Sequence, residues 1–219
     1  MASCCTSCST VAGTNKFFSK HSARYLKQFR KKGLAKEQQL LVKGIELSPV
    51  NGSSILEIGC GVGGLHLTLL QHGASSAVGI DISEGMLEGA KQLSKDLGFG
   101  ERTTYRLGDF VQLNGEIDKA DITILDKVVC CYEDVDTLLE KSLSKTKRMY
   151  ALSFPRPNLL VKLTFQIPII LSKLLKWFFR PYWHDWVGVV RKIEASGFKN
   201  IYRSTTMLWE VRVFENKID

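Results

Sequence analysis

Residues 55–64 read Ile-Leu-Glu-Ile-Gly-Cys-Gly-Val-Gly-Gly, and this stretch decides the fold class. An apolar run of strand length leads directly into a glycine-rich turn, and a helical pattern follows. Glycine lets the backbone bend sharply and approach a ligand closely, and the start of a helix offers free N–H groups. Gly59, Gly61 and Gly64 also fit the G-x-G-x-x-G dinucleotide fingerprint, so the turn alone predicts a nucleotide-like ligand without identifying it.

Strand and helix patterns alternate along the rest of the chain. The expected strands are 54–58, 76–80, 102–107, 121–125 and 149–154, and the expected helices are 63–72, 83–97, 135–144 and 186–196. This alternation predicts an α/β fold with a doubly wound parallel sheet. Two further strands, 198–203 and 206–214, follow each other directly and predict an antiparallel hairpin at one edge.

The chain has 219 residues, which suits one domain with additions. We expect a disordered, cysteine-containing tail over residues 1–14 and a helical cap over 15–48, divided near Gly33. The ligand-binding domain is expected over 49–219, with a helical lid insertion at about 155–184 that Pro168 divides into two helices.

Carboxylates mark the strand ends. Glu57 lies within the first expected strand, and Asp81, Asp109 and Asp126 end the second, third and fourth. The carboxyl ends of parallel strands meet at one edge, where such sheets bind ligands. Glu57 beside the glycine turn suits a cationic amino group and would repel a pyrophosphate, and Asp81 can accept hydrogen bonds from ribose hydroxyls. Glu57 and the absence of a second, catalytic domain argue against a nicotinamide-dependent dehydrogenase.

This ordered pattern resembles the class I S-adenosylmethionine (SAM)-dependent methyltransferases over residues 50–154 and through the C-terminal hairpin. The resemblance implies a Rossmann-like, seven-stranded sheet, with SAM as cofactor and S-adenosylhomocysteine as product. It implies that the glycine turn holds the methionine end, Asp81 the ribose, and the residues after the second and third strands the adenine. The cofactor contacts expected from it are Tyr25, Glu57, Gly59, Cys60, Gly61, Asp81, Ile82, Met86, Gly108, Asp109, Phe110, Asp126 and Lys127.

Two segments are similar to the small-molecule methyltransferases of ubiquinone biosynthesis and to magnesium-protoporphyrin O-methyltransferases. Residues 17–25 resemble the helix that closes over SAM in that group, and residues 182–185, Tyr-Trp-His-Asp, resemble an aromatic-histidine stretch. Where those relatives carry histidines after the fourth strand, this chain has Cys130 and Cys131. We expect His184 as a general base, Tyr25 as an orienting group and Cys131 as a soft lining of the methyl pocket. Packing is the alternative for each, and His21, His66 and His72 are expected to be surface or cap residues.

The insertion Leu159–Phe179 is apolar but interrupted by lysines. A cation at the centre of a bilayer costs about 2.5–3.5 kcal/mol on insertion scales, so a transmembrane helix is not expected. Three interpretations stay open: a lid over the acceptor, a helix on a membrane surface, or a cap packed on the core. The first residues lack the features of a signal peptide and the six cysteines form no disulfide framework, which predicts a cytoplasmic protein, with peripheral membrane contact as an addition.

The net charge of +8 is unevenly distributed. Residues 1–50 hold nine Lys and Arg against two acids, residues 51–150 hold ten against fifteen, and no acid occurs between Lys141 and His184. A nucleic-acid-binding domain would be more uniformly basic. We therefore expect a small, apolar or anionic acceptor and no nucleic-acid partner. A nucleic-acid methyltransferase and a non-catalytic SAM-binding module at a membrane are the alternatives. No metal is expected, although Cys5, Cys8, Cys130 and Cys131 would suit a thiolate site if they met.

Overall fold

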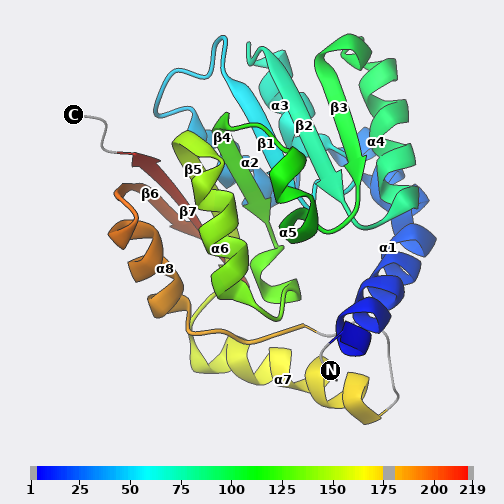
Figure 1. The fold of residues 1–219 in the computed structure, drawn as a ribbon, viewed down its shortest axis with the longest axis vertical. Helices are drawn as coiled ribbons and strands as arrows, with labels where there is room; N and C mark the ends of the chain where they lie inside the picture. Colours follow the sequence, from blue (N-terminus) through cyan, green and yellow to red (C-terminus); the bar gives the residue numbers. More distant parts are fainter. Residues whose placement is uncertain (1–3, 175–180, 217–219) are drawn as a thin grey trace.

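A seven-stranded mixed sheet forms the centre of the protein, in the order β3-β2-β1-β4-β5-β7-β6 (Figure 1). The computed structural model describes the backbone of residues 4–174 and 181–216 and the side chains of residues 15–166 and 181–216. The strands are β1 (Ser54–Ile58), β2 (Ser76–Asp81), β3 (Thr103–Leu107), β4 (Ala120–Asp126), β5 (Thr146–Pro155), β6 (Phe198–Thr205) and β7 (Trp209–Asn216). The first five pair in parallel, and β7 pairs antiparallel with both β5 and β6. The predicted Rossmann-like sheet with a C-terminal hairpin is therefore confirmed.

The strand order reverses between β1 and β4. The chain runs outward from β1 to β3 and then returns to place β4 on the other side of β1. Ligands bind in such sheets beyond the carboxyl ends of the strands at the point of reversal. The topology thus puts the glycine turn after β1 beside the loop after β4.

Helices cover both faces of the sheet, and side chains of β5 alternate between two cores. The helices are α1 (Cys4–Lys32), α2 (Lys36–Ile45), α3 (Gly64–Gln71), α4 (Glu84–Asp96), α5 (Phe110–Leu113), α6 (Val135–Ser144), α7 (Leu159–Leu174) and α8 (Trp186–Ala195). Tyr150 and Leu152 pack toward α6 and α8, whereas Met149 and Ala151 pack toward α2 and α3. This period of two follows from the alternating side-chain directions of a strand.

Two helices differ from the predictions. Residues 4–14 form part of α1 and not a disordered tail, and this stretch contains no proline that would end the helix. α7 runs through Pro168 as one helix, so the predicted division into two helices is wrong. A proline removes one backbone hydrogen bond of a helix, and α7 continues beyond it to Leu174. The predicted break at Gly33 is confirmed, because its φ of +67° ends α1 before α2 begins.

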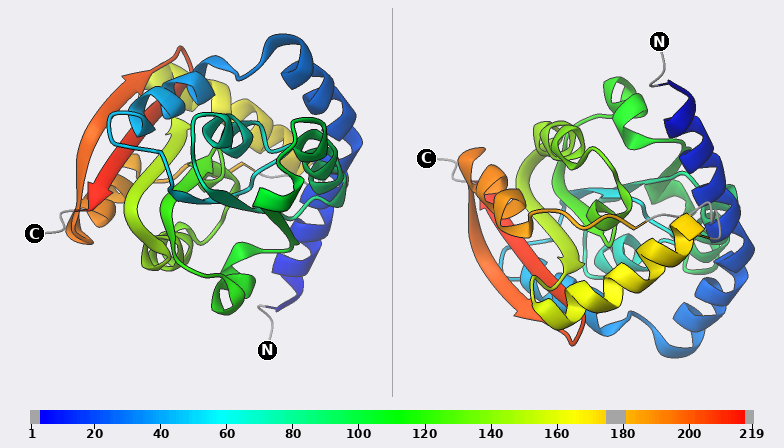
Figure 2. Two further views of the ribbon diagram at one scale, coloured as in Figure 1. Left: turned by 90° about the horizontal axis from the view of Figure 1, so that it is seen from above. Right: turned by 90° about the horizontal axis from the view of Figure 1, so that it is seen from below.

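The N-terminal helix packs against α4 beside the carboxyl end of β2. Ser19 Oγ lies 2.8 Å from Ser83 Oγ, and Ser83 is the N-cap of α4, as predicted. A Cβ on Gly85 would lie 3.0 Å from the backbone of Ser19, so the two helices meet at a glycine. Farther along, Arg30 forms an ion pair with Asp96. α7 crosses the molecule near the same edge of the sheet (Figures 1 and 2).

Candidate active site

The glycine turn after β1 leaves its backbone open to a ligand. Gly59, Gly61 and Gly63 all have φ between +53° and +81°, which glycine adopts most readily. A Cβ on Gly59 would lie 2.4 Å from Val128 Cγ2, so this glycine lets the loop after β4 approach the turn. A Cβ on Gly61 would have no atom within 4 Å. Open space beside a half-buried stretch of backbone is what a bound nucleoside-like cofactor requires.

Asp81 ties the glycine turn to the start of α4. Its Oδ2 accepts a hydrogen bond from Gly61 N–H at 2.8 Å, and its Oδ1 accepts one from Ser83 N–H at 2.8 Å. Burial raises the pKa of Asp81 to about 6, although both N–H groups act in the opposite direction. A carboxylate oxygen has more than one acceptor site, so Asp81 retains capacity for the expected ribose hydroxyls.

Glu57 is bound by His66 on the inner side of the glycine turn. Its Oε2 lies 2.6 Å from His66 Nδ1 and accepts the His66 backbone N–H at 3.2 Å. His66 Nε2 lies 3.0 Å from the Tyr105 hydroxyl. The expectation that His66 is a surface or cap residue is wrong, because α3 buries this side chain completely against β1. Burial raises the pKa of Glu57, while the hydrogen bond and charge of His66 lower it.

Asp109 and Asp126 are also held by protein partners at the same edge. Asp109 caps α5 by accepting Val111 N–H at 2.9 Å, and both its oxygens accept the Tyr132 hydroxyl at 3.1 and 2.9 Å. Asp126 accepts Ser153 Oγ–H at 2.5 Å and Gln38 Nε2–H at 2.9 Å. Asp109 therefore connects the residues after β3, where the adenine is expected to bind, to the loop after β4.

Lys127 follows β4 in a backbone conformation that is rare outside glycine, with φ of +59°. Its ammonium group lies 2.5 Å from Glu37 Oε1, 3.5 Å from Asp126 Oδ2 and 5.6 Å from the centre of the Trp209 ring. These charges raise its pKa against the effect of burial. Lys127 is thus a cation fixed between α2, β4 and β7.

Other expected cofactor contacts divide into buried and accessible groups. Cys60, Met86 and Phe110 are buried, so they form the packing beneath the edge. Ile82 and Gly108 are half-buried. Tyr25 lies on α1 and is 44% exposed, which leaves it accessible on the helix that docks at Ser83.

The two cysteines after β4 differ in exposure. Cys130 is buried in the core and Cys131 is half-buried, with their sulfur atoms 3.9 Å apart. Both thiols donate to the Lys127 carbonyl, at 3.4 and 3.2 Å. The hydrogen bond with Cys131 and burial raise the pKa of Cys130, so Cys130 is a neutral packing thiol. Of the two cysteines, Cys131 is the one that can line the expected methyl pocket.

His184 is positioned by the loop that carries these cysteines. Its Nε2 lies 2.9 Å from the Tyr132 carbonyl, which can only accept, so Nε2 carries the proton. The basic lone pair of the neutral ring is then on Nδ1. The ring is stacked with Tyr182 and meets Trp186 edge-on, and burial lowers its pKa. His184 is therefore a neutral, oriented imidazole at pH 7.

The sequence alone does not reveal several residues that hold this edge together. Glu37 and Gln38 come from α2, Ser153 from β5 and Tyr132 from the loop after β4. Gln38 carries one local signal, because its Oε1 also accepts Ala35 N–H in a capping arrangement at the start of α2. Within the described side chains, no group of three His, Cys, Asp or Glu is placed to hold a metal ion. The proposed contribution of Cys5 and Cys8 falls outside those side chains.

Comparisons with known proteins agree with this geometry. Residues 55–149 match the family described as methyltransferase domain. A crystal structure of magnesium protoporphyrin IX methyltransferase from Synechocystis, with S-adenosylhomocysteine bound, superposes with a TM-score of 0.71 over 93% of this chain and 98% of that one, at 23% identity. Residues 55–149 therefore form a methyltransferase domain, and the chain has the fold of that methyltransferase structure. The open turn at Gly61 beside Asp81 is compatible with a cofactor of the kind bound in that structure.

Two curated methyltransferases match part of the chain. The magnesium-protoporphyrin O-methyltransferase of Synechocystis is 35% identical over 106 residues, which are 47% of this chain and 44% of that protein. The sterol 24-C-methyltransferase of Yarrowia lipolytica is 30% identical over 95 residues, which are 43% of this chain and 24% of that protein. The chain thus matches less than half the length of each relative. One relative is named for methylating oxygen and the other for methylating carbon, so the methyltransferase domain leaves the acceptor atom open.

Proposed function

We propose that the protein transfers the methyl group of SAM to a small, apolar or anionic acceptor. The observation that carries this proposal is the hydrogen bond that Gly61 N–H donates to Asp81 Oδ2. It places a carboxylate beside a glycine backbone that has open space around it. Asp81 would bind the ribose hydroxyls, and the Gly59–Gly61 backbone would hold the methionine end. Ile82, Gly108 and Asp109 would surround the adenine, with Met86 and Phe110 packed beneath them.

SAM supplies an electrophilic methyl group on a positively charged sulfur. The task of the chain is then to exclude water and to align the acceptor with that methyl carbon. Glu57 lies behind the turn with His66 as its partner, and it stabilises the turn while adding negative potential near the sulfonium. Cys131 would contribute a polarizable wall.

His184 is the proposed general base. Its neutral ring holds the proton on Nε2 through the Tyr132 carbonyl, which leaves Nδ1 able to accept a proton from an acceptor hydroxyl or amine. Tyr25 would orient the acceptor from α1. An acceptor that loses no proton would need neither group as a base.

Calorimetric titration tests the cofactor assignment. We expect the wild-type protein to bind SAM and S-adenosylhomocysteine and not NADH, and the Asp81→Ala variant to lose both ligands. Incubation with methyl-labelled SAM and separate pools of lipid extract, small anionic metabolites and RNA then tests the acceptor class. Label in the lipid or metabolite pool supports the proposal, and label in RNA alone would instead support the nucleic-acid alternative, which the basic residues 24–36 favour.

We also propose that the protein works in the cytoplasm and touches a membrane surface through residues 159–179. Within the described part of the chain, no helix combines the length and hydropathy needed to cross a bilayer. The contact would therefore be peripheral, with α7 lying along the surface.

A further inference from the structure

α7 presents leucines to solvent on its outer side. Leu159, Leu160 and Leu163 are 71%, 76% and 50% exposed, whereas Val161 on the inner side is 4% exposed. Phe165 also faces inward, with its ring 6.0 Å from that of Trp183 and 5.9 Å from that of Trp209. The inner side therefore anchors α7 on the body, and the outer side has no partner among the described residues.

The turn between β6 and β7 extends this apolar surface. Met207 is 80% exposed and Leu208 is 36% exposed. The turn is attached to the residues before α7, because Arg156 N–H donates to the Leu208 carbonyl at 2.9 Å and Arg156 Nη1 donates to the Thr206 carbonyl at 3.2 Å. The turn and the start of α7 lie side by side in the view from below (Figure 2). We call these five side chains the apolar rim: Leu159, Leu160, Leu163, Met207 and Leu208.

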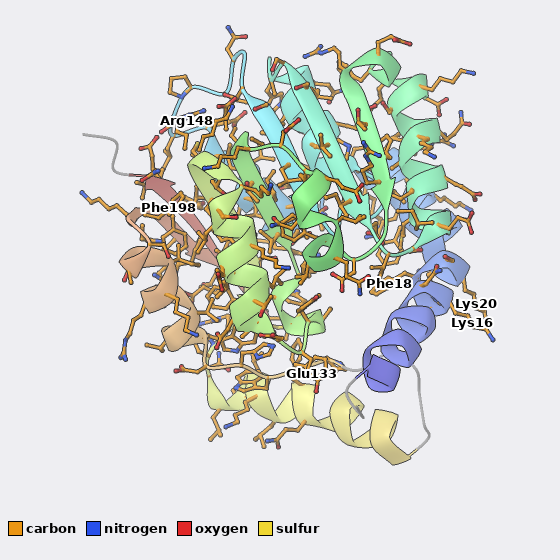
Figure 3. The ribbon with its side chains drawn as sticks, in the orientation of Figure 1. Lys16, Phe18, Lys20, Glu133, Arg148 and Phe198 are labelled. Atoms are coloured by element: carbon orange, nitrogen blue, oxygen red, sulfur yellow. The ribbon has the colours of Figure 1, made fainter. Side chains whose placement is uncertain are left out.

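Lys162 is exposed on α7 beside the leucines of the apolar rim, and further cations lie on α1, toward the other end of α7 (Figures 1 and 3). α1 contains seven Lys and Arg and no Asp or Glu, and no acid occurs between Lys141 and His184. Lys16 and Lys20 point away from the body, while Phe18 lies on the inner side of α1 (Figure 3). The helical spacing of Lys16, Lys20, Lys27 and Lys31 continues one basic stripe along the helix. Among the described residues near α7, Glu133 is acidic and exposed, and it accepts a hydrogen bond from the Tyr182 hydroxyl at 3.3 Å.

The combination points to one partner. Exposed leucines beside lysines fit the interface of a bilayer, where apolar side chains enter the acyl boundary and cations meet anionic headgroups. Two copies of this chain would bring like charges together along α1, which disfavours self-association through this face. Nucleic acid would satisfy the lysines but not the leucines.

We propose that the apolar rim docks on an anionic lipid bilayer with Lys162 at the headgroups, so that the acceptor enters from the membrane. The second part rests on the proposed methyl transfer. α7 crosses the carboxyl edge of the sheet, where the cofactor turn lies (Figures 1 and 2). An amphiphile leaving the lipid beside α7 therefore reaches that edge directly.

Flotation of the full-length protein with lipid vesicles tests the docking. We expect binding to phosphatidylcholine vesicles that contain phosphatidylglycerol, little binding to pure phosphatidylcholine, and release as salt concentration rises. The Leu159→Ser/Leu160→Ser/Leu163→Ser variant should bind the vesicles with an affinity that is lower by about tenfold or more. The Lys162→Gln variant should bind about fivefold more weakly. Val187→Ser is the matched control, because Val187 is 51% exposed on α8, outside the rim, and its binding should not change.

Three results would overturn the docking proposal. One is an absence of binding to anionic vesicles, and another is wild-type binding by the triple serine variant. The third is a concentration-dependent dimer in light scattering that the serine variant abolishes, which would assign the rim to a second copy. Titration with SAM separates this proposal from the proposed function: vesicle binding without SAM binding contradicts methyl transfer alone, and SAM binding without vesicle binding contradicts docking alone.

Discussion

Glu57 Oε2 and His66 Nδ1 lie 2.6 Å apart, and both side chains are almost completely removed from solvent. This pair joins β1 to α3 directly behind the glycine turn, and the Tyr105 hydroxyl extends it to β3. A buried carboxylate is expensive unless it is paired and hydrogen-bonded. The geometry of the turn thus depends on a histidine that never reaches the surface.

Loss of His66 should destabilise the whole domain. The His66→Ala variant leaves the buried Glu57 without its partner, and breaking a buried pair in this way typically lowers the free energy of unfolding by about 3–5 kcal/mol. His66→Gln/Glu57→Gln restores a neutral hydrogen-bonded pair and should recover part of that loss. Urea denaturation measures both variants. Equal stability of His66→Ala and wild type would contradict the role given to this pair.

Asp81 should make SAM affinity depend on pH. Its folded-state pKa is about 6, so acidification through pH 6 protonates the carboxylate and removes the charged acceptor of the ribose hydroxyls. We expect the dissociation constant for SAM to rise between pH 7 and pH 5 and to be flat above pH 7. Calorimetry across this range checks the effect, with Asp81→Asn as a variant that should bind weakly at every pH.

The raised pKa of Asp81 also affects folding stability, which should fall as pH rises, whereas SAM affinity should increase. The pKa is raised on folding, so the unfolded chain releases this proton first, and the contribution of Asp81 to stability falls as pH rises from about 4 to 6. The difference from the usual value of 3.8 corresponds to about 3 kcal/mol. Denaturation of the wild type and of the Asp81→Asn variant at pH 5 and pH 7 measures the stability lost as pH rises, and this loss should be smaller in the variant. A steeper loss in the variant would contradict this sign.

Gly61 should be required for the cofactor and not for the fold. Gly61 and Gly52 have φ of +53° and +75°, and neither would place a Cβ within 4 Å of another atom. The Gly61→Ala and Gly52→Ala variants should therefore share a similar backbone penalty of about 1–2 kcal/mol. Only Gly61→Ala puts a methyl group into the expected cofactor space, so it alone should lose SAM binding. Loss of binding in both variants would indicate an effect through stability.

His184 should act on the rate of transfer and not on cofactor binding. Once an acceptor is identified, His184→Gln should lower kcat by about 10²–10⁴-fold if a proton is removed, with the SAM dissociation constant unchanged. Because burial lowers the pKa of His184, the wild-type rate should fall only below pH 6.5, and the variant should lack this acidic limb. Cys131→Ser serves as a control in the same loop, with a much smaller effect expected. An unchanged rate for His184→Gln assigns the ring to packing against Tyr182 and Trp186.

The fold could be predicted from the sequence because its signals are local. Period-two strands, glycine turns and the Ser83 cap each depend on a few neighbouring residues, and β1, α6 and the C-terminal hairpin lie where the pattern places them. The partners of the site residues could not be predicted in this way. Asp126 meets Gln38 from 88 positions earlier in the chain, and periodicity does not say which polar residue of a helix faces inward. His66 was missed for the same reason.

The close approach of α1 and α4 at Gly85 has a consequence for reading other sequences. Any side chain there would meet Ser19 at about 3.0 Å, so the present seat of the N-terminal helix is tightest against α4 when the second residue of α4 is glycine. A Ser-x-Gly sequence after the second strand is thus a feature that accommodates a first helix packed closely on α4. A larger residue at that position would require the first helix to shift away from α4.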